Sequence, residues 1–159
     1  MVREILLLGN PKLYEVSLPV TSDKLPTLKS IVEDLHDTLL DFRSKYGVGR
    51  AIAAPQIGEK LRLIYMNIDE PVIFINPKLI VDETSMMEIL DDCMSFPNLL
   101  VKVMRYKNCS IQYLDMNWIS HTMVLEGDLS ELIQHEYDHL DGVLATMRAI
   151  DNQSFIIKT

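Results

Sequence analysis

The chain has 159 residues, 48% of them hydrophobic and 24% charged, which fits one globular domain over residues 1–159 with a substantial core. Its net charge of −8 argues against a nucleic-acid binder and against a protein that binds membranes through a basic surface. No segment reaches the ~18 apolar residues needed to cross a bilayer, and the apolar run Ile5–Leu8 is too short for a signal peptide. We therefore expect a cytoplasmic protein without a membrane partner.

The first third of the chain predicts an irregular arm followed by one amphipathic helix. Residues 1–23 contain turn residues and no periodic pattern. Apolar residues then recur at every third or fourth position from Pro26 to Tyr46, which predicts a helix that stops at Gly47. A glycine-containing loop leads from there into the small apolar segment Ala51–Gln56.

Short β-like runs separated by turn residues occupy the middle of the chain. They are Leu61–Ile68, Val72–Asn76, Leu79–Val81, Leu99–Met104, Ser110–Leu114 and His121–Leu125. A second helix is predicted from about Asp128 to a stop at Gly142, and the tail holds a candidate strand at Phe155–Ile157. This order predicts an α+β fold, in which a helix is followed by antiparallel strands and a final helix.

The second predicted helix carries the run Gln134–His139, which contains His-Glu-x-x-His. His135 and His139 are four residues apart, so both imidazoles lie on one helical face and can reach one metal ion. Glu136 can hold or deprotonate the water that such a metal activates. Apolar neighbours indicate that this face is partly buried, where two imidazoles need a shared partner. We therefore interpret the two histidines as metal ligands rather than as unrelated surface or core residues.

The third metal ligand has to be sought upstream of the motif. Common zinc peptidases take a His or Glu downstream, but the 20 residues after His139 contain neither. Upstream candidates are Cys93, Cys109, His121 and several carboxylates. Cys109 lies in a strand-like run and is expected in the core, whereas His121 has polar neighbours and is expected at the surface. Cys93 lies in a polar, loop-like segment, where its thiolate would complete a Cys-His-His site with an open fourth position.

Three segments of this chain, in this order, resemble the peptide deformylase family. Gly49–Gln56 resembles the first family motif, Gly-x-Gly-x-Ala-Ala-x-Gln. Asp91–Ser95 resembles the second, Glu-Gly-Cys-Leu-Ser, and Gln134–His139 matches the third. The spacing fits as well, and the resemblance covers nearly the whole chain. It implies the family's fold, with antiparallel strands packed around a C-terminal metal-binding helix and an additional N-terminal helix.

The resemblance also implies an activity, namely removal of the N-formyl group from formylated, typically formyl-methionyl, peptides or nascent chains with release of formate. It implies one divalent metal ion, natively Fe(II) with Zn, Ni or Co as substitutes, held by Cys93, His135 and His139. Glu136 would take a proton from the attacking water and deliver it to the leaving amine. The side-chain amide of Gln56 and the backbone N–H of Met94 would donate hydrogen bonds to the oxyanion.

The sequence departs from the family pattern in its first two motifs. Ala51 replaces the second glycine of the first motif, on a backbone that pairs with the substrate. Asp91 replaces Glu and is expected to pair with Arg105, which we interpret as a brace for the loop. Asp92 replaces Gly and adds negative charge near the metal and the peptide entrance.

The pocket for the first substrate side chain also departs from the family pattern. Asp128, Glu131 and Leu132 share a helical face with His135, where the family usually presents apolar residues at the first two positions. Arg50 stands where the first motif normally has an aliphatic residue. We hypothesise that Arg50 and Glu131 line or gate the pocket as a pair and make it polar; the alternative is that both point to solvent. The predicted substrate-binding residues are therefore Gly49, Arg50, Ala51, Asp92, Glu131 and Leu132.

Alternative functions follow from the same features. A deformylase-like binding protein would have lost efficient turnover through Ala51 and Asp92, and a variant enzyme would act on non-standard formylated substrates. A zinc endopeptidase is disfavoured by the missing downstream ligand and by Cys93. A metal-dependent deformylase is the leading interpretation, because every residue expected to take part in catalysis is present.

Overall fold

Two α-helices and eight β-strands form the regular structure of the chain, in a computed structural model that describes residues 1–159. The helices are α1 (Leu25–Tyr46) and α2 (Asp128–Leu140). The strands are β1 (Ala51–Ala53), β2 (Leu63–Asn67), β3 (Pro71–Val81), β4 (Met86–Asp91), β5 (Leu99–Tyr106), β6 (Asn108–Leu114), β7 (Ser120–Glu126) and β8 (Phe155–Ile157). Short 3-10 turns lie at Pro11–Tyr14, Ser22–Lys24, Ala54–Ile57 and Ala145–Arg148. Neither helix has the length and apolar character required to span a membrane.

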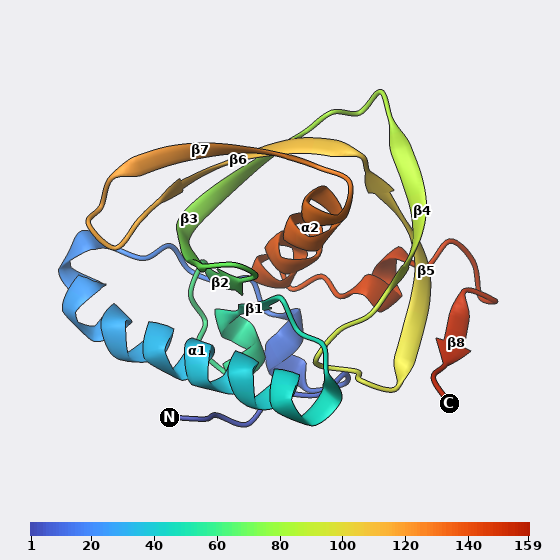
Figure 1. The fold of residues 1–159 in the computed structure, drawn as a ribbon, viewed down its shortest axis with the longest axis horizontal. Coiled ribbons are helices and arrows are strands. Elements are labelled where there is room, and N and C mark those ends of the chain that lie inside the picture. The colour runs from blue at the N-terminus through green and yellow to red at the C-terminus, as the bar shows by residue number, and fades with distance from the viewer.

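The strands form two antiparallel sheets on either side of α2 (Figure 1). One sheet has the order β1-β2-β3-β6-β7, and the smaller one has the order β4-β5-β8. Helix α1 lies across the β1–β2 end of the larger sheet, on the face opposite to the one that packs against α2 (Figure 1). The predicted α+β fold, with antiparallel strands around a C-terminal helix, is confirmed.

Helix α1 forms as its sequence pattern predicts, beginning one residue early at Leu25. Pro26 occupies the first turn, where its missing N–H is harmless, and Gly47 ends the helix with a φ of 73°. The apolar stripe of α1 packs into the largest core cluster, against Ile52 and Tyr65 of β1 and β2. This packing places the C-terminal end of α1 beside the segment that leads into β1.

Helix α2 is buried on nearly all sides, unlike a surface helix with a single apolar stripe. It packs against β1, β5 and β7, so polar and apolar side chains are both enclosed. The helix ends at Leu140 rather than at the predicted Gly142. At Gly142 the φ is +71°, and an added Cβ would lie 2.5 Å from the carbonyl oxygen of Tyr14. The close approach at this glycine fixes the end of α2 against the N-terminal arm.

The prediction of two strands at Val72–Asn76 and Leu79–Val81 was wrong, because the structure has one strand, β3. Its pairing register with β6 shifts between Ile75 and Lys78, which marks an irregularity rather than an end. Asn76 at this point has a φ of 48°, and its side-chain amide bonds both the N–H and the carbonyl of Val20. The interruption in the sequence pattern therefore reflects a bend that anchors the N-terminal arm.

Strand β4 was missed by the sequence prediction. Its six residues include only one β-branched residue, Ile89, and the apolar Met86 and Leu90 point outward. Pairing with β5, which runs from Met86 opposite Tyr106 to Asp91 opposite Val101, imposes the extended conformation. Strand β1 was missed as well, because Ala51–Gln56 was predicted only as a small apolar segment. Strands β2, β5, β6, β7 and the short β8 were predicted within a few residues of their observed bounds.

We expect Gly142→Ala to destabilise the fold. A left-handed conformation at a non-glycine residue costs about 1–3 kcal/mol, and the clash with the Tyr14 backbone adds to it. Gly58→Ala is the matched control, because Gly58 has a φ of +85° but nothing within 4 Å of an added Cβ. Thermal unfolding should show a larger fall in Tm for Gly142→Ala; equal falls would contradict the proposed backbone contact.

Candidate metal centre and active site

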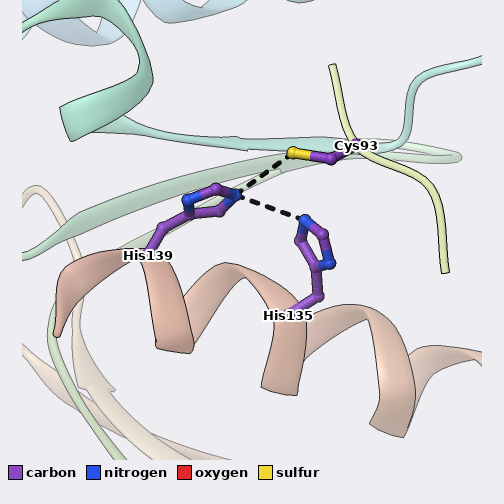
Figure 2. Close-up of side chains that lie close together, drawn as sticks. All are labelled: Cys93, His135 and His139. Carbon is purple, nitrogen blue, oxygen red and sulfur yellow. Dashed lines mark hydrogen bonds between the residues drawn. The ribbon is translucent and has the colours of Figure 1, made fainter. Parts of the chain in front are cut away.

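Three atoms that could bind one metal ion converge between α2 and the loop after β4 (Figure 2). Nε2 of His139 lies 3.4 Å from Sγ of Cys93 and 3.2 Å from Nε2 of His135. All three ligand atoms lie within 4.8 Å of one another, and all three residues are buried. Helical spacing brings the two imidazoles together, and the β4–β5 connection brings Cys93 to them from 42 residues earlier in the chain than His135.

The chemistry of these donors fits a divalent cation. A thiolate and two imidazoles are a ligand set used for Zn and other transition metals, and the three atoms leave room for a further ligand. Burial opposes charge on His135, yet the neighbouring Asp91 and Cys93 raise its pKa well above the usual value. The environment therefore attracts positive charge, which a metal ion would supply in place of the proton. Burial and the neighbouring His135 lower the pKa of His139, which favours the neutral form needed for a ligand.

Asp91 orients the imidazole of His135 through the ring nitrogen that faces away from Cys93 and His139. Nδ1 of His135 donates to Oδ2 of Asp91 at 2.9 Å, which directs Nε2 toward the other ligands. Arg105 donates to the same oxygen at 2.8 Å. Burial alone would raise the pKa of Asp91, but His135 and Arg105 outweigh it and lower the pKa to about 2. The expected Asp91–Arg105 pair exists, but the expectation that it only braces the loop was wrong.

Asp138 extends this buried network and was not predicted from the sequence. Arg105 donates to it at 2.7 Å, and Arg148 binds both of its carboxylate oxygens. Asp138 lies next to His139 on α2, so the network connects the helix to β5 and to the turn after α2. An acidic residue inside an otherwise buried metal motif is the signal that could have indicated a buried basic partner.

Glu136 is buried and makes no side-chain hydrogen bond within the chain. Its Oε2 is one of the few buried polar atoms without a partner, although the side chain lines the same cavity as Cys93 and His135. Burial raises the pKa of Glu136 to about 7. A carboxyl group in this state is suited to accept and return a proton.

The side-chain amide of Gln56 is held in one orientation. Its Oε1 accepts a hydrogen bond from the backbone N–H of Ala53 at 2.9 Å. Its Nε2 therefore faces the metal ligands, 3.6 Å from Sγ of Cys93 and 3.2 Å from Oγ of Ser95. Ser95 was not predicted, although it belongs to the second motif. Met94 lines the cavity, and no acceptor within the chain binds its backbone N–H.

A cleft of about 720 Å³ opens onto this cluster and contains the other predicted residues. Its lining includes Gly49, Arg50, Ala51, Asp92, Glu131 and Leu132. Nη2 of Arg50 lies 3.1 Å from Oε1 of Glu131, and Oδ2 of Asp92 lies 3.5 Å from Nζ of Lys158, which was not predicted. The pairing hypothesised for Arg50 and Glu131 is therefore present, and the two side chains do not simply point to solvent.

Three other residues weighed as site candidates lie away from the cleft. The placement of Asp128 in the pocket was wrong: it is the exposed first residue of α2 and does not line the cleft. Cys109 is buried in the apolar core, where it accepts a hydrogen bond from Ser130, and His121 is exposed and bonds Asp115. The expectations for Cys109 and His121 are confirmed.

Comparison with known proteins decides the family. The profile of the family described as polypeptide deformylase matches residues 2–155. The chain belongs to this family. The peptide deformylase of Treponema pallidum (strain Nichols) is 35% identical over 142 residues, covering 89% of this chain and 84% of the relative. Peptide deformylase 1 of Prochlorococcus marinus (strain MIT 9313) is 34% identical over 166 residues, covering 97% and 84%.

Solved deformylase structures share the fold. The crystal structure of peptide deformylase from Thermotoga maritima has a TM-score of 0.86 at 30% identity, covering 95% of this chain and 99% of that one. The enzyme from Synechococcus elongatus, solved in complex with actinonin, has a TM-score of 0.87 at 27% identity, covering 96% and 81%. The chain is therefore a peptide deformylase, an enzyme that removes N-formyl groups from peptides. The alternative of a zinc endopeptidase is excluded by this membership.

We expect Asp91→Asn to weaken metal binding by this deformylase. Loss of a carboxylate that orients a ligating histidine typically lowers metal affinity about 10–100-fold. Competition with a chelator, followed by metal analysis, measures the effect. Glu88→Gln is the matched control, because it removes a carboxylate from an exposed position of the same strand, β4. Equal metal retention by the two variants would contradict the role given to Asp91.

Proposed function

We propose that residues 1–159 act as one cytoplasmic catalytic domain that deformylates peptides with Cys93, His135 and His139 as ligands of a single Fe(II) ion. The convergence of the three ligand atoms beside the unpartnered carboxylate of Glu136 carries this proposal. A thiolate with two imidazoles also accepts Zn, Ni or Co, so metal analysis of anaerobically purified protein tests the identity of the ion. When bound, the metal acidifies the attacking water and polarises the formyl group.

The substrate main chain pairs with the free edge of β1 in this proposal. Arg50 and Ile52 face β2, since the carbonyl of Arg50 accepts from Asn67 and Ile52 lies opposite Tyr65. Backbone groups alternate in direction along an antiparallel strand, so those of Ala51 point to the open edge. An extended peptide can add to such an edge through main-chain hydrogen bonds.

Side chains of the same sheet region limit where a peptide can pair. Arg43 donates through Nε to the carbonyl of Gly49, and Gln56 accepts from the N–H of Ala53. Gly49, Ala51 and Ala53 face the same edge, so Ala51 lies between two positions that are already occupied. Its N–H and carbonyl are the groups left for the substrate next to the metal centre.

Glu136 performs the proton transfers. It accepts a proton from the attacking water and delivers it to the amine that leaves as the bond to the formyl carbon breaks. The raised pKa of about 7 makes both directions feasible near neutral pH. Burial and the absence of a competing hydrogen bond leave its carboxylate free for the water.

Gln56 and Met94 stabilise the oxyanion that forms on the formyl oxygen. The amide of Gln56 is already oriented by Ala53, so it needs no reorganisation during the reaction. The backbone N–H of Met94 follows the ligand Cys93 directly and is free to donate. Each such donor contributes roughly 2.7–4 kcal/mol of transition-state stabilisation.

The two departures that suggested a weakened enzyme are accommodated by the structure. Ala51 does not have a positive φ, so its methyl group requires no backbone strain. Asp92 is half-exposed, and Lys158 lies close enough to compensate its charge. Both observations support turnover rather than binding alone.

We expect Glu136→Gln to retain the metal and to lower kcat by about 10²–10⁴-fold, because general acid–base catalysis is removed. Formate release from a formyl-methionyl peptide measures the rate, and metal analysis measures occupancy. Cys93→Ser is the comparison variant and should lose metal together with activity. Near-normal turnover by Glu136→Gln would sink the assignment of the base.

We expect Gln56→Ala to lower kcat by about 10²–10³-fold with little change in KM, because its amide acts on the transition state. The metal content should stay that of the unsubstituted enzyme. A rise in KM at constant kcat would instead indicate a role in ground-state binding, contrary to the proposal.

A further inference from the structure

The two side chains of the Arg50–Glu131 salt bridge differ in their exposure to solvent. The Glu131 side chain is 15% exposed, whereas that of Arg50 is 41% exposed. Glu131 therefore belongs to the wall of the cleft and Arg50 to its rim. The bridge joins the segment before β1 to α2 across the region beside the metal ligands, so a substrate side chain entering there meets it.

Arg50 can leave the bridge without disturbing the backbone. Its carbonyl is held by the N–H of Asn67 at 2.8 Å, which fixes the main chain independently of the guanidinium. The bond to Glu131 is the one side-chain hydrogen bond that Arg50 makes. A half-exposed guanidinium regains water when it rotates outward, and a cationic substrate group at Glu131 would replace it, so the exchange leaves no buried carboxylate unpaired. Glu131, on a buried helix, has no comparable freedom.

The position of Glu131 sets the length of side chain that can reach it. Glu131 precedes His135 by four residues, which is slightly more than one helical turn, or about 6 Å along α2. The first side chain after the formyl group starts next to the metal ligands. It must therefore extend over roughly one helical turn to meet the carboxylate. Lysine, arginine, methionine and norleucine have this reach and short side chains do not, so length alone does not choose among the long ones.

The charge of the cleft decides among long side chains. Asp91, Asp92, Glu131 and Glu136 line the cleft, and Asp91 and Asp92 already have cationic partners. An acidic side chain that reaches Glu131 would meet a like charge there. The cations are Arg43, which is bonded to backbone carbonyls, and the rim residues Arg50 and Lys158. Once Arg50 has moved to the rim, an apolar side chain would leave the Glu131 carboxylate without a hydrogen-bond donor, which is unfavourable.

We infer that Glu131 is a specificity-determining residue that receives a long cationic side chain, lysine or arginine, at the first position after the formyl group. Arg50 occupies this place in the free enzyme and swings to the rim when substrate binds. The inference rests on the proposed function, since it takes the formyl group to lie at the metal centre. It distinguishes this chain from a deformylase with an apolar pocket for methionine.

The first test compares matched formyl-Lys, formyl-norleucine and formyl-Glu peptides with the metal-loaded enzyme. We expect kcat/KM for formyl-Lys to exceed that for formyl-norleucine by about tenfold or more, as for a charge-assisted hydrogen bond. Norleucine has the same four-carbon stem as lysine and lacks only the terminal ammonium group. A preference for norleucine in the unsubstituted enzyme overturns the inference.

Single substitutions test whether the Glu131 carboxylate causes the preference for formyl-Lys over formyl-norleucine. Glu131→Gln should abolish most of the lysine advantage while norleucine turnover persists. Arg50→Ala should raise kcat/KM for formyl-Lys, because the internal competitor is gone. Asp128→Asn removes a charge from the same helix outside the cleft and should leave the ratio unchanged. A Glu131→Gln variant that slows all peptides equally overturns the inference.

Binding separates this inference from the proposed function. Peptides capped with acetyl instead of formyl, carrying lysine or norleucine first, are titrated into the metal-loaded enzyme by calorimetry. Tighter binding of the lysine peptide, lost in Glu131→Gln, supports the pocket even if no formyl peptide is hydrolysed, a result that would contradict the proposed function alone. Equal or weaker binding of the lysine peptide overturns the pocket inference whether or not turnover occurs.

Discussion

The candidate metal centre depends on a buried network of charged side chains that runs from His135 through Asp91 and Arg105 to Asp138. Burying these charges is costly, and each is retained because opposite charges and hydrogen bonds surround it. This charged network connects α2 to β4 and β5, so it also fixes the position of the smaller sheet relative to the helix. Because Cys93 follows Asp91 by two residues, the same interaction that aims the imidazole also places the thiolate.

The sequence predicted those elements of the fold and the site that depend on interactions between residues close together in the chain. The periodicity before Tyr46 and the glycine after it define α1, and the His-Glu-x-x-His spacing places two ligands and a carboxylate on one side of α2. Cys93 could be singled out because no His or Glu follows the motif and because Cys93, unlike the other upstream candidates, lies in a polar, loop-like segment. The family resemblance then supplied Gln56, whose orientation by Ala53 no sequence pattern would reveal.

The features that escaped prediction depend on contacts distant in sequence. Strand β4 is extended because β5 pairs with it, and β3 continues past Asn76 because that side chain finds Val20, 56 residues earlier. The bond between Asp91 and His135 joins residues 44 apart. Asp128 has the helical spacing of a pocket residue, but it lies at the exposed start of α2, where the cleft does not reach.

The short free edge of β1 also bears on solubility. An unpaired strand edge can recruit strands from other protein molecules, and the edge proposed to bind the substrate has to stay open for that binding. Here Arg43 and Gln56 occupy the positions on either side of Ala51, and the strand is only three residues long. An incoming strand would find a single residue to pair with, too little for edge-to-edge aggregation. By bonding to the backbone on either side of Ala51, Arg43 and Gln56 leave room for the end of one peptide but not for a second strand of the length that fibril growth requires.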